Sequence, residues 1–305
     1  MSLVECVPNF SEGRDRDKVN RIRDAIASVD TVKILDVEMD PNHNRSVITF
    51  VCDSSRAVDA AFAGIKAAAE IIDMDAHRGE HPRFGAADVI PFVPLQDTKM
   101  DTCIKLARDL GRRVGEELGI PVYLYSEAAQ RPDRYDLAAI RNKNFQYEQL
   151  KEAIKDEKWK PDFGPSTVGK AGASIIGARD FLIAYNVNLN TNNMEIGKKI
   201  ASALRAKDGG LTFVKSLAFF LKDKNMVQIS MNLTNYRKTP IYRAFELVRM
   251  EAARYGVMPV ESEIVGLVPE QALIDVAKFY LQLNGFDENN ILERKMEKAA
   301  KEQKD

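Results

Sequence analysis

Hydrophobic residues recur along the chain with two different periods, and these periods predict its helices and strands. In residues 15–29 the apolar positions lie three or four residues apart, which places one apolar stripe on a helix. In residues 226–233 apolar and polar residues alternate, as in a strand with one buried face. By the same criteria we expect helices at 57–72, 100–118, 194–207, 241–255 and 270–281, and strands at 3–7, 32–37, 46–52, 88–93, 122–125, 181–189, 214–221 and 258–265.

The order of these elements predicts the fold class. Each half of the chain has the order βαββαβ, and the first half continues with one more helix and strand. Two strand-helix-strand units that share a sheet form the ferredoxin-like plan. We therefore predict an α+β protein of two ferredoxin-like βαββαβ subdomains, residues 1–178 and 179–305, whose mixed sheets face a ligand cleft.

Three segments lie outside this plan. Residues 127–160 are rich in Lys and Glu and are expected to form an appended, helical and solvated connector. Residues 161–173 contain two prolines and three glycines, which predicts a loop between the halves. Its glycines would let backbone amides approach a ligand, although a plain interdomain linker explains the composition as well. Residues 284–305 are a charged tail, expected to be a solvated helix.

Composition and charge exclude several classes of protein. With 305 residues and 45% hydrophobic residues, the chain can bury a sizeable core. The net charge is −1 with scattered Lys and Arg, which argues against nucleic acid or an anionic membrane as the main partner. The three cysteines have apolar neighbours and no disulfide pattern, and no stretch approaches the ~20 apolar residues of a membrane span. Without a signal-peptide pattern at the N-terminus, we expect a cytoplasmic protein.

Two of the three histidines lie in one segment, residues 71–91. His77 and His81 flank a glycine and precede a proline, so this segment is expected to be a loop rather than a helix. A carboxylate such as Glu80 could orient one imidazole nitrogen and leave the other as a general base. A metal site is disfavoured because a His-x-x-x-His pair chelates from one helical face. A charged surface loop with two structural histidines is the alternative, and His43, in a run of turn formers, is interpreted as a loop histidine.

Two strands of the second half carry polar rows. Along residues 181–189 and 226–233 one face is apolar, and the other carries amides and a hydroxyl rather than the Lys, Glu or Thr of a typical solvated face. Such groups suit hydrogen bonding to a polar heterocycle, and plain exposure to solvent is the alternative. The candidate cleft residues are Asn186, Asn188, Gln228, Ser230 and Asn232.

Five motifs, in the same order along nearly the whole chain, carry a family resemblance. They are residues 6–13 (CVPNFSEG), 79–83 (GEHPR) with Asp88, 121–125 (PVYLY), 161–165 (PDFGP) and 264–269 (IVGLVP). Together they resemble the glutamate formiminotransferase family, in the form without a cyclodeaminase domain. Residues 168–171 look one residue shorter than in the animal form, and Glu38 stands where that form has Asp.

The resemblance implies an enzyme of histidine degradation. Such an enzyme transfers the formimino group of N-formiminoglutamate to N5 of tetrahydrofolate and releases 5-formiminotetrahydrofolate and glutamate. It implies His81 as the catalytic histidine, tetrahydrofolate as a co-substrate, no metal, and folate lying between the subdomains. The implied folate-binding loop consists of Asp162, Phe163, Gly164, Pro165, Ser166, Thr167, Val168, Gly169, Lys170 and Ala171.

Several further expectations accompany this assignment. A guanidinium can pair with a carboxylate through two hydrogen bonds, which makes three arginines candidates for the glutamate carboxylates, although each could equally be a surface or structural ion-pair residue. The arginine candidates are Arg45, Arg83 and Arg179, and the other cleft candidates are Glu38, His77 and Glu80. We expect a homodimer. Formyl transfer between glutamate and folate, and folate binding without catalysis, are the alternative functions.

Overall fold

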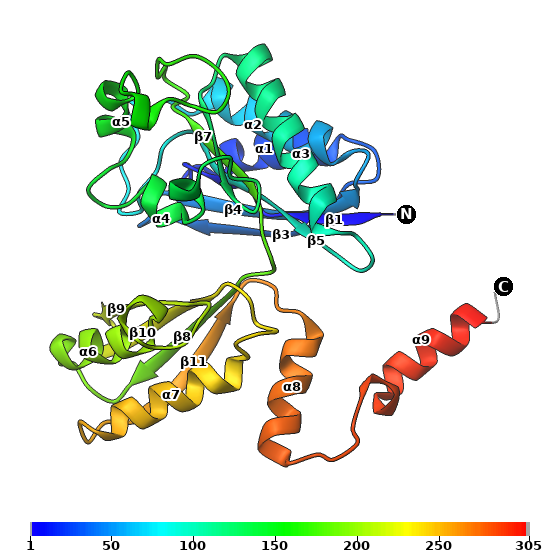
Figure 1. Cartoon of the computed structure of the whole chain (residues 1–305), viewed down its shortest axis with the longest axis vertical. Helices are drawn as coiled ribbons and strands as arrows, with labels where there is room; N and C mark the ends of the chain where they lie inside the picture. Colours follow the sequence, from blue (N-terminus) through cyan, green and yellow to red (C-terminus); the bar gives the residue numbers. More distant parts are fainter. Residues whose placement is uncertain (1, 303–305) are drawn as a thin grey trace. The chain divides into compact units, whose positions relative to one another are not determined.

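The computed structural model describes residues 2–302 and divides the chain into two compact units, Met1–Asp180 and Phe181–Asp305 (Figure 1). Each unit combines helices with a single sheet, so the predicted α+β class with two subdomains is confirmed.

The first unit is built on a seven-stranded mixed sheet. In spatial order, β3 lies at one edge, followed by β4, then β1 and β2 end to end, then β5, β7 and β6. Strands β3, β4, β1, β2 and β5 pair antiparallel, and β7 pairs parallel with both β5 and β6. The strands are β1 (Leu3–Cys6), β2 (Asn9–Phe10), β3 (Lys33–Asp40), β4 (Arg45–Asp53), β5 (Ala87–Pro94), β6 (Val122–Ser126) and β7 (Ser174–Ala178).

Three amphipathic helices cover one face of this sheet (Figure 1). They are α1 (Arg16–Ala27), α2 (Ala57–Ile71) and α3 (Met100–Arg113), and a π-helical turn, Val114–Leu118, extends α3. Helix α1 begins at Asp15, whose carboxylate accepts hydrogen bonds from the backbone N–H groups of Asp17 and Lys18. Val19, Ile22 and Ile26 of its apolar stripe are fully buried, at the spacing that the sequence predicted.

Residues 127–160 pack on the opposite face of the sheet. They form the short helices α4 (Leu137–Ile140) and α5 (Tyr147–Ala153) and two 3-10 turns, Pro132–Arg134 and Glu157–Trp159. Ile140, Leu150 and Ile154 are buried there beside Tyr123 and Ile175. The expectation of a helical segment is confirmed, but the expectation of a solvated connector is wrong, because these apolar side chains complete a second core.

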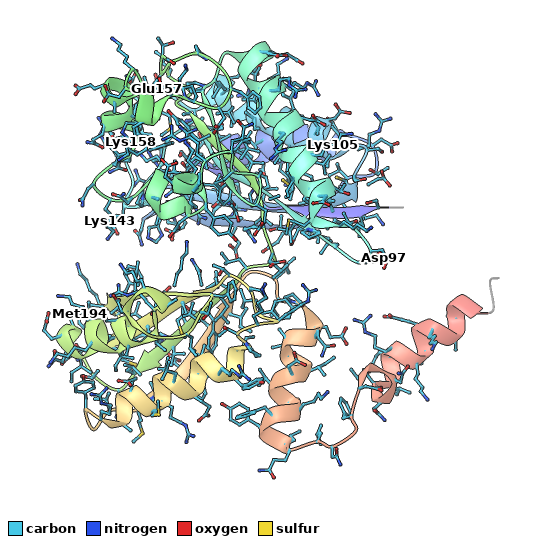
Figure 2. All side chains as sticks on the ribbon, viewed as in Figure 1. Asp97, Lys105, Lys143, Glu157, Lys158 and Met194 are labelled. Atoms are coloured by element: carbon cyan, nitrogen blue, oxygen red, sulfur yellow. The ribbon has the colours of Figure 1, made fainter. Side chains whose placement is uncertain are left out.

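Charged residues of the same segment lie on its outer side. Lys143, Glu157 and Lys158 are exposed and extend away from the sheet (Figure 2). These residues give the segment its polar composition, which concealed the few buried positions.

Strand β7 was not predicted, and its presence changes which elements the loop at 161–173 connects. The strand lies between β5 and β6, and it is fully buried. The glycine-rich loop therefore leads from one part of the first unit to another, and its assignment as a loop between the halves is wrong. A fully buried parallel strand has no polar alternation that would mark it in the sequence.

The second unit is a four-stranded antiparallel sheet in the order β11-β8-β10-β9, with helices on one face. This is the ferredoxin-like strand order. The sheet is antiparallel rather than mixed, because the parallel strands β8 and β9 are separated by β10. The elements are β8 (Ile183–Leu189), α6 (Met194–Leu204), β9 (Val214–Leu221), β10 (Met226–Leu233), α7 (Ile241–Ala253), β11 (Pro259–Val265) and α8 (Glu270–Leu281).

The chain continues past α8 as a charged tail. A 3-10 turn, Glu288–Asn290, precedes α9 (Leu292–Glu302), and the described side chains of α9 are exposed. The predicted solvated helix is present from Leu292 to Glu302, and residues 303–305 of the predicted tail lie outside the described residues. Within residues 2–302, no helix is both long and apolar enough to cross a membrane.

Candidate active site

Three segments of the first unit meet around the turn between β3 and β4. This turn, residues 40–45, lies between the backbone at Gly13 and the loop that contains Gly79. A Cβ on Gly13 would collide with the carbonyl of Asp40, and one on Gly79 would collide with the carbonyl of His43. The two glycines therefore allow three chain segments to approach closely, and all three histidines of the protein line the small cavity between them.

Asn44 holds this junction together. Its backbone has φ +50°, and its side-chain Oδ1 accepts a hydrogen bond from Gly13 N at 3.0 Å. Its Nδ2 donates to the carbonyl of Arg78 at 3.0 Å, and its own carbonyl accepts from His77 Nε2 at 3.0 Å. One residue thus connects the β2–α1 segment, the turn and the histidine loop.

His77 has a structural position. Because the carbonyl of Asn44 can only accept, Nε2 of His77 carries the hydrogen, and Nδ1 accepts from Arg83 Nε at 3.2 Å. Burial lowers the pKa of His77, which keeps the ring neutral. With both ring nitrogens already in use, His77 cannot take a proton from a substrate in this arrangement.

His81 has the opposite character. Its Nδ1 donates to the carbonyl of Pro82 at 2.8 Å, so the neutral ring has its lone pair on Nε2, to which residues 2–302 offer no hydrogen bond. Burial, followed by the positive charges of Arg45 and Arg141, lowers the pKa of His81 to about 3. We expected Glu80 to orient this ring, but the Pro82 carbonyl does so, and Glu80 is exposed.

His43 lies beside His81. The two ring centroids are 5.9 Å apart, with an angle of 84° between the ring planes. Nδ1 of His43 lies 2.5 Å from Asp40 Oδ2, and the His43 side chain is 44% exposed. The sequence analysis placed His43 correctly in a loop but did not connect it with the site. The spacing Asp-x-x-His within a tight turn is the one signal that could have indicated the pair.

Arg45 provides positive charge to the site. Arg45 is half-buried, its Nη2 donates to Asn9 Oδ1, and its buried Nε has no hydrogen-bond partner within the described residues. In the β3–β4 ladder, Asp40 lies opposite Arg45 and Glu38 lies opposite Val47. Glu38 and Asp40 are therefore on the same face of the sheet as Arg45. Burial, with a contribution from Asp36, raises the pKa of Glu38, and Arg45 opposes that rise.

The other two candidate arginines have internal partners. Arg83 is 6% exposed and contacts Glu148 at 2.6 Å, in addition to its bond with His77. Arg179 donates to the carbonyl of Asp180 at 2.9 Å and lies near the buried carboxyl of Glu5. Burial raises the pKa of Glu5 to about 7, against the opposing effect of Arg179. Among the three arginines, Arg45 has a buried Nε without a hydrogen-bond partner in residues 2–302.

The cavity itself has a volume of about 10 Å³, room for no more than one water molecule. A substrate therefore has to bind on the open side, where His43 is exposed. The cavity wall includes Asp88, whose Oδ1 accepts from Phe84 N at 2.7 Å and whose Oδ2 lies 2.9 Å from Arg141 Nη2. Within residues 2–302, no group of three or more His, Cys, Asp or Glu side chains is arranged to hold a metal ion.

The predicted folate loop is divided between buried and exposed residues. Asp162 is buried, and its carboxylate accepts from Arg134 Nη1 and from Leu124 N, each at 2.7 Å. This carboxylate therefore supports the loop. Gly164 has φ +83°, and a Cβ at this position would collide with the carbonyl of Ile120. Phe163, Val168 and Ala171 are half-buried, and the exposed positions are Gly164, Pro165, Ser166, Thr167, Gly169 and Lys170.

The polar rows of the second unit form a hydrogen-bonded ladder across three strands. Gln228 Nε2 donates to Asn188 Oδ1 at 3.0 Å, and Asn188 Nδ2 donates to Glu261 Oε1 at 2.7 Å. Asn186 Nδ2 donates to Glu263 Oε1 at 3.0 Å. Asn188 and Gln228 are buried, Asn186 and Ser230 are half-buried, and Asn232 is exposed. The apolar positions that alternate with these residues are buried in the core beneath the helices, so the polar rows lie on the opposite face.

Comparison with known proteins identifies the family. The sequence model for the "Formiminotransferase domain, N-terminal subdomain" matches residues 3–179, and that for the "Formiminotransferase domain" matches residues 184–299. The chain belongs to the formiminotransferase family. The resemblance carried by the five motifs is thereby confirmed, and with it the assignment to a family of transferases.

Individual relatives agree with the family assignment. A "Glutamate formimidoyltransferase" of Thermoplasma acidophilum is 94% identical over 300 residues, which cover 98% of this chain and 99% of that protein. A protein of the same name from Streptococcus pyogenes is 44% identical over 93% of this chain and 95% of its own length. A "Formimidoyltransferase-cyclodeaminase" of Rattus norvegicus is 45% identical over 91% of this chain, but the match covers only 52% of the rat protein. The chain thus resembles the form without a cyclodeaminase domain.

Proposed function

We propose that this protein transfers the formimino group of N-formiminoglutamate to N5 of tetrahydrofolate, giving 5-formiminotetrahydrofolate and glutamate in histidine degradation. The observation that carries the proposal is the neutral His81 ring, with Nδ1 fixed on a carbonyl and Nε2 unoccupied. The names of the relatives at 94% and 44% identity support the same reaction. Tetrahydrofolate is the proposed co-substrate, and no metal is required.

The proposed mechanism begins with attack of N5 on the formimino carbon to form a tetrahedral intermediate. His81 Nε2 accepts the N5 proton as a general base, which fits the tautomer set by the Pro82 carbonyl. The carbon–nitrogen bond to glutamate then breaks, the C=N bond re-forms, and the departing nitrogen takes up a proton. The enzyme forms no covalent intermediate, and holding both substrates together supplies much of the rate.

We propose that the negative charge of the bound substrate raises the pKa of His81 and so makes it a stronger base. In the free protein the positive charges of Arg45 and Arg141 contribute to the low pKa of His81. A glutamate carboxylate bound on the open side, beside the Arg45 guanidinium, would offset that charge and raise the pKa of His81 towards its ordinary range. The base would then gain strength only when the donor is bound.

The folate contacts are proposed on the family resemblance. We propose that folate touches the exposed part of the loop at 162–171, and that the polar rows of β8 and β10 provide hydrogen bonds to its ring. A cytoplasmic homodimer is part of the same proposal. Size-exclusion chromatography with light scattering tests the oligomeric state.

A single assay tests the reaction. Purified protein is mixed with tetrahydrofolate and either N-formiminoglutamate or N-formylglutamate, and the folate products are identified by mass spectrometry. We expect 5-formiminotetrahydrofolate from the first donor and little product from the second. Product from the formyl donor alone would support formyl transfer instead. No product from either donor, with tetrahydrofolate binding that is unchanged in His81→Ala, would indicate a folate-binding protein without catalysis.

A further inference from the structure

His43 and Asp40 form a pair in the turn between β3 and β4. Asp40 Oδ1 accepts the backbone N–H groups of Asn42 and His43, each at 2.9 Å, which fixes the carboxylate. Its Oδ2 lies 2.5 Å from His43 Nδ1, so the ring donates from Nδ1 and presents Nε2 away from the carboxylate. Burial favours the protonated carboxyl, but the hydrogen bonds from His43 outweigh it and lower the pKa of Asp40. The carboxylate is therefore ionised.

The rings of His43 and His81 are fixed in the same way but in opposite electrostatic surroundings. Each ring donates from Nδ1, one to a carboxylate and the other to the carbonyl of Pro82, and each leaves Nε2 without a partner among residues 2–302. Beside His43 lies the negative charge of Asp40, whereas the charges that act on His81 include Arg45. Two adjacent imidazoles, each with Nε2 free and Nδ1 held, can divide proton delivery and proton removal between them.

We propose that His43 is the general acid of the transfer, acting from Nε2 on the departing glutamate nitrogen, opposite His81 as the base. This inference rests on the proposed formimino transfer. The reaction needs a proton removed from one nitrogen and a proton delivered to another on the same tetrahedral carbon. The two rings, with centroids 5.9 Å apart, offer one Nε2 for each task.

The protons and bonds balance in this scheme. The N5–carbon bond forms as the C=N π pair moves onto the imino nitrogen, and the N5 proton passes to His81 Nε2. The imino nitrogen then re-forms the C=N bond as the bond between that carbon and the glutamate nitrogen breaks. The electron pair of the broken bond takes the proton from His43 Nε2, and Asp40 balances the charge of the His43 imidazolium. His81 is left protonated and His43 neutral, and return of one proton between the adjacent rings through water resets the site.

The His43 ring contributes little to the stability of the turn. The turn is held by the backbone N–H of His43 and by the side chains of Asp40 and Asn44, and the His43 ring is 44% exposed. Replacement of the ring should therefore leave the fold intact. The neighbouring Asn42 has an exposed side chain in the same turn and provides a matched control.

The test compares His43→Gln, Asp40→Asn and the control Asn42→Ala with the wild-type enzyme. We expect His43→Gln to lower kcat by about a hundredfold, with folate affinity and KM for N-formiminoglutamate within a few-fold. Asp40→Asn keeps the acceptor for the turn but removes the charge, and we expect about a tenfold loss of kcat. Asn42→Ala should retain wild-type activity, and thermal melts confirm that each variant is folded.

A second donor separates acid catalysis from positioning. An aryl formimidate, in which a nitrophenol that carries the dicarboxylate replaces the glutamate amine, releases a phenolate that departs without taking a proton. With this donor the defect of His43→Gln should shrink at least tenfold, whereas the defect of His81→Ala should persist. Activity of His43→Gln within threefold of wild type on N-formiminoglutamate, or equal defects with both donors, would overturn the proposal. A wild-type enzyme that forms no formimino product would instead overturn the proposed function on which it rests.

Discussion

Acid should destabilise this protein through His81, and the size of the effect follows from its surroundings. The pKa of His81 is about 3 in the folded protein, against an ordinary value of 6.5. Between these pH values the unfolded chain binds a proton that the folded protein does not. Stability is therefore complete above pH 6.5 and falls as the pH decreases towards 3, by at most about 1.4 kcal/mol per pH unit from this one group.

The assay is urea unfolding of wild type and His81→Gln at several pH values from about 6.5 down to about 4.5. Glutamine can still donate to the Pro82 carbonyl but cannot be protonated. The buried His77 is present in both proteins, so its contribution cancels. The stability of wild type relative to the variant should fall by about 1 kcal/mol per pH unit. If the two curves stay parallel, His81 is not held neutral by its surroundings, and the argument from Arg45 and Arg141 fails.

Three other substitutions probe the rest of the site. Arg45→Gln should raise KM for N-formiminoglutamate at least tenfold in steady-state kinetics, because the donor carboxylate loses a charged partner; an unchanged KM would exclude Arg45 as that partner. Asn44→Ala should lower the urea unfolding free energy by about 2 to 3 kcal/mol through the loss of two side-chain hydrogen bonds at a residue with positive φ, and a loss below about 0.5 kcal/mol would contradict this role. Asn232→Leu and Asn188→Leu should each weaken tetrahydrofolate binding in calorimetry by about 1 to 3 kcal/mol, and Asn188→Leu alone should also destabilise the fold because it breaks the ladder. Undiminished affinity in both variants would place the polar rows outside the site.

The regular elements could be predicted because their patterns are local. In β10, the alternation of apolar and polar residues predicted both the strand and the face that it buries. Strand β7 could not be found in this way, because its five residues are all buried and follow a loop rich in Gly and Pro. The packing of residues 137–154 depends on a few apolar residues, among them Ile140, Leu150 and Ile154, within a polar composition.

The site was only partly predictable because tertiary contacts assign its roles. The sequence showed two histidines in one loop, but the difference between them depends on Asn44, which engages His77 and not His81. The approach of His43 to His81 depends on two glycines far apart in the chain, at which no side chain could fit. Arg83 was predicted to contact substrate because it is a charged residue inside a motif. In the structure its partner is instead Glu148 of the same unit.

Turnover by His81→Ala tests the central claim most directly. The variant is compared with wild type and with His77→Ala for the rate of 5-formiminotetrahydrofolate formation and for tetrahydrofolate affinity. If His81 Nε2 takes the N5 proton, His81→Ala should lower kcat by about a hundredfold or more with folate affinity within a few-fold, and His77→Ala should lose much less. Wild-type turnover in His81→Ala would contradict the account, and equal losses in both variants would show that the two histidines do not have separate roles.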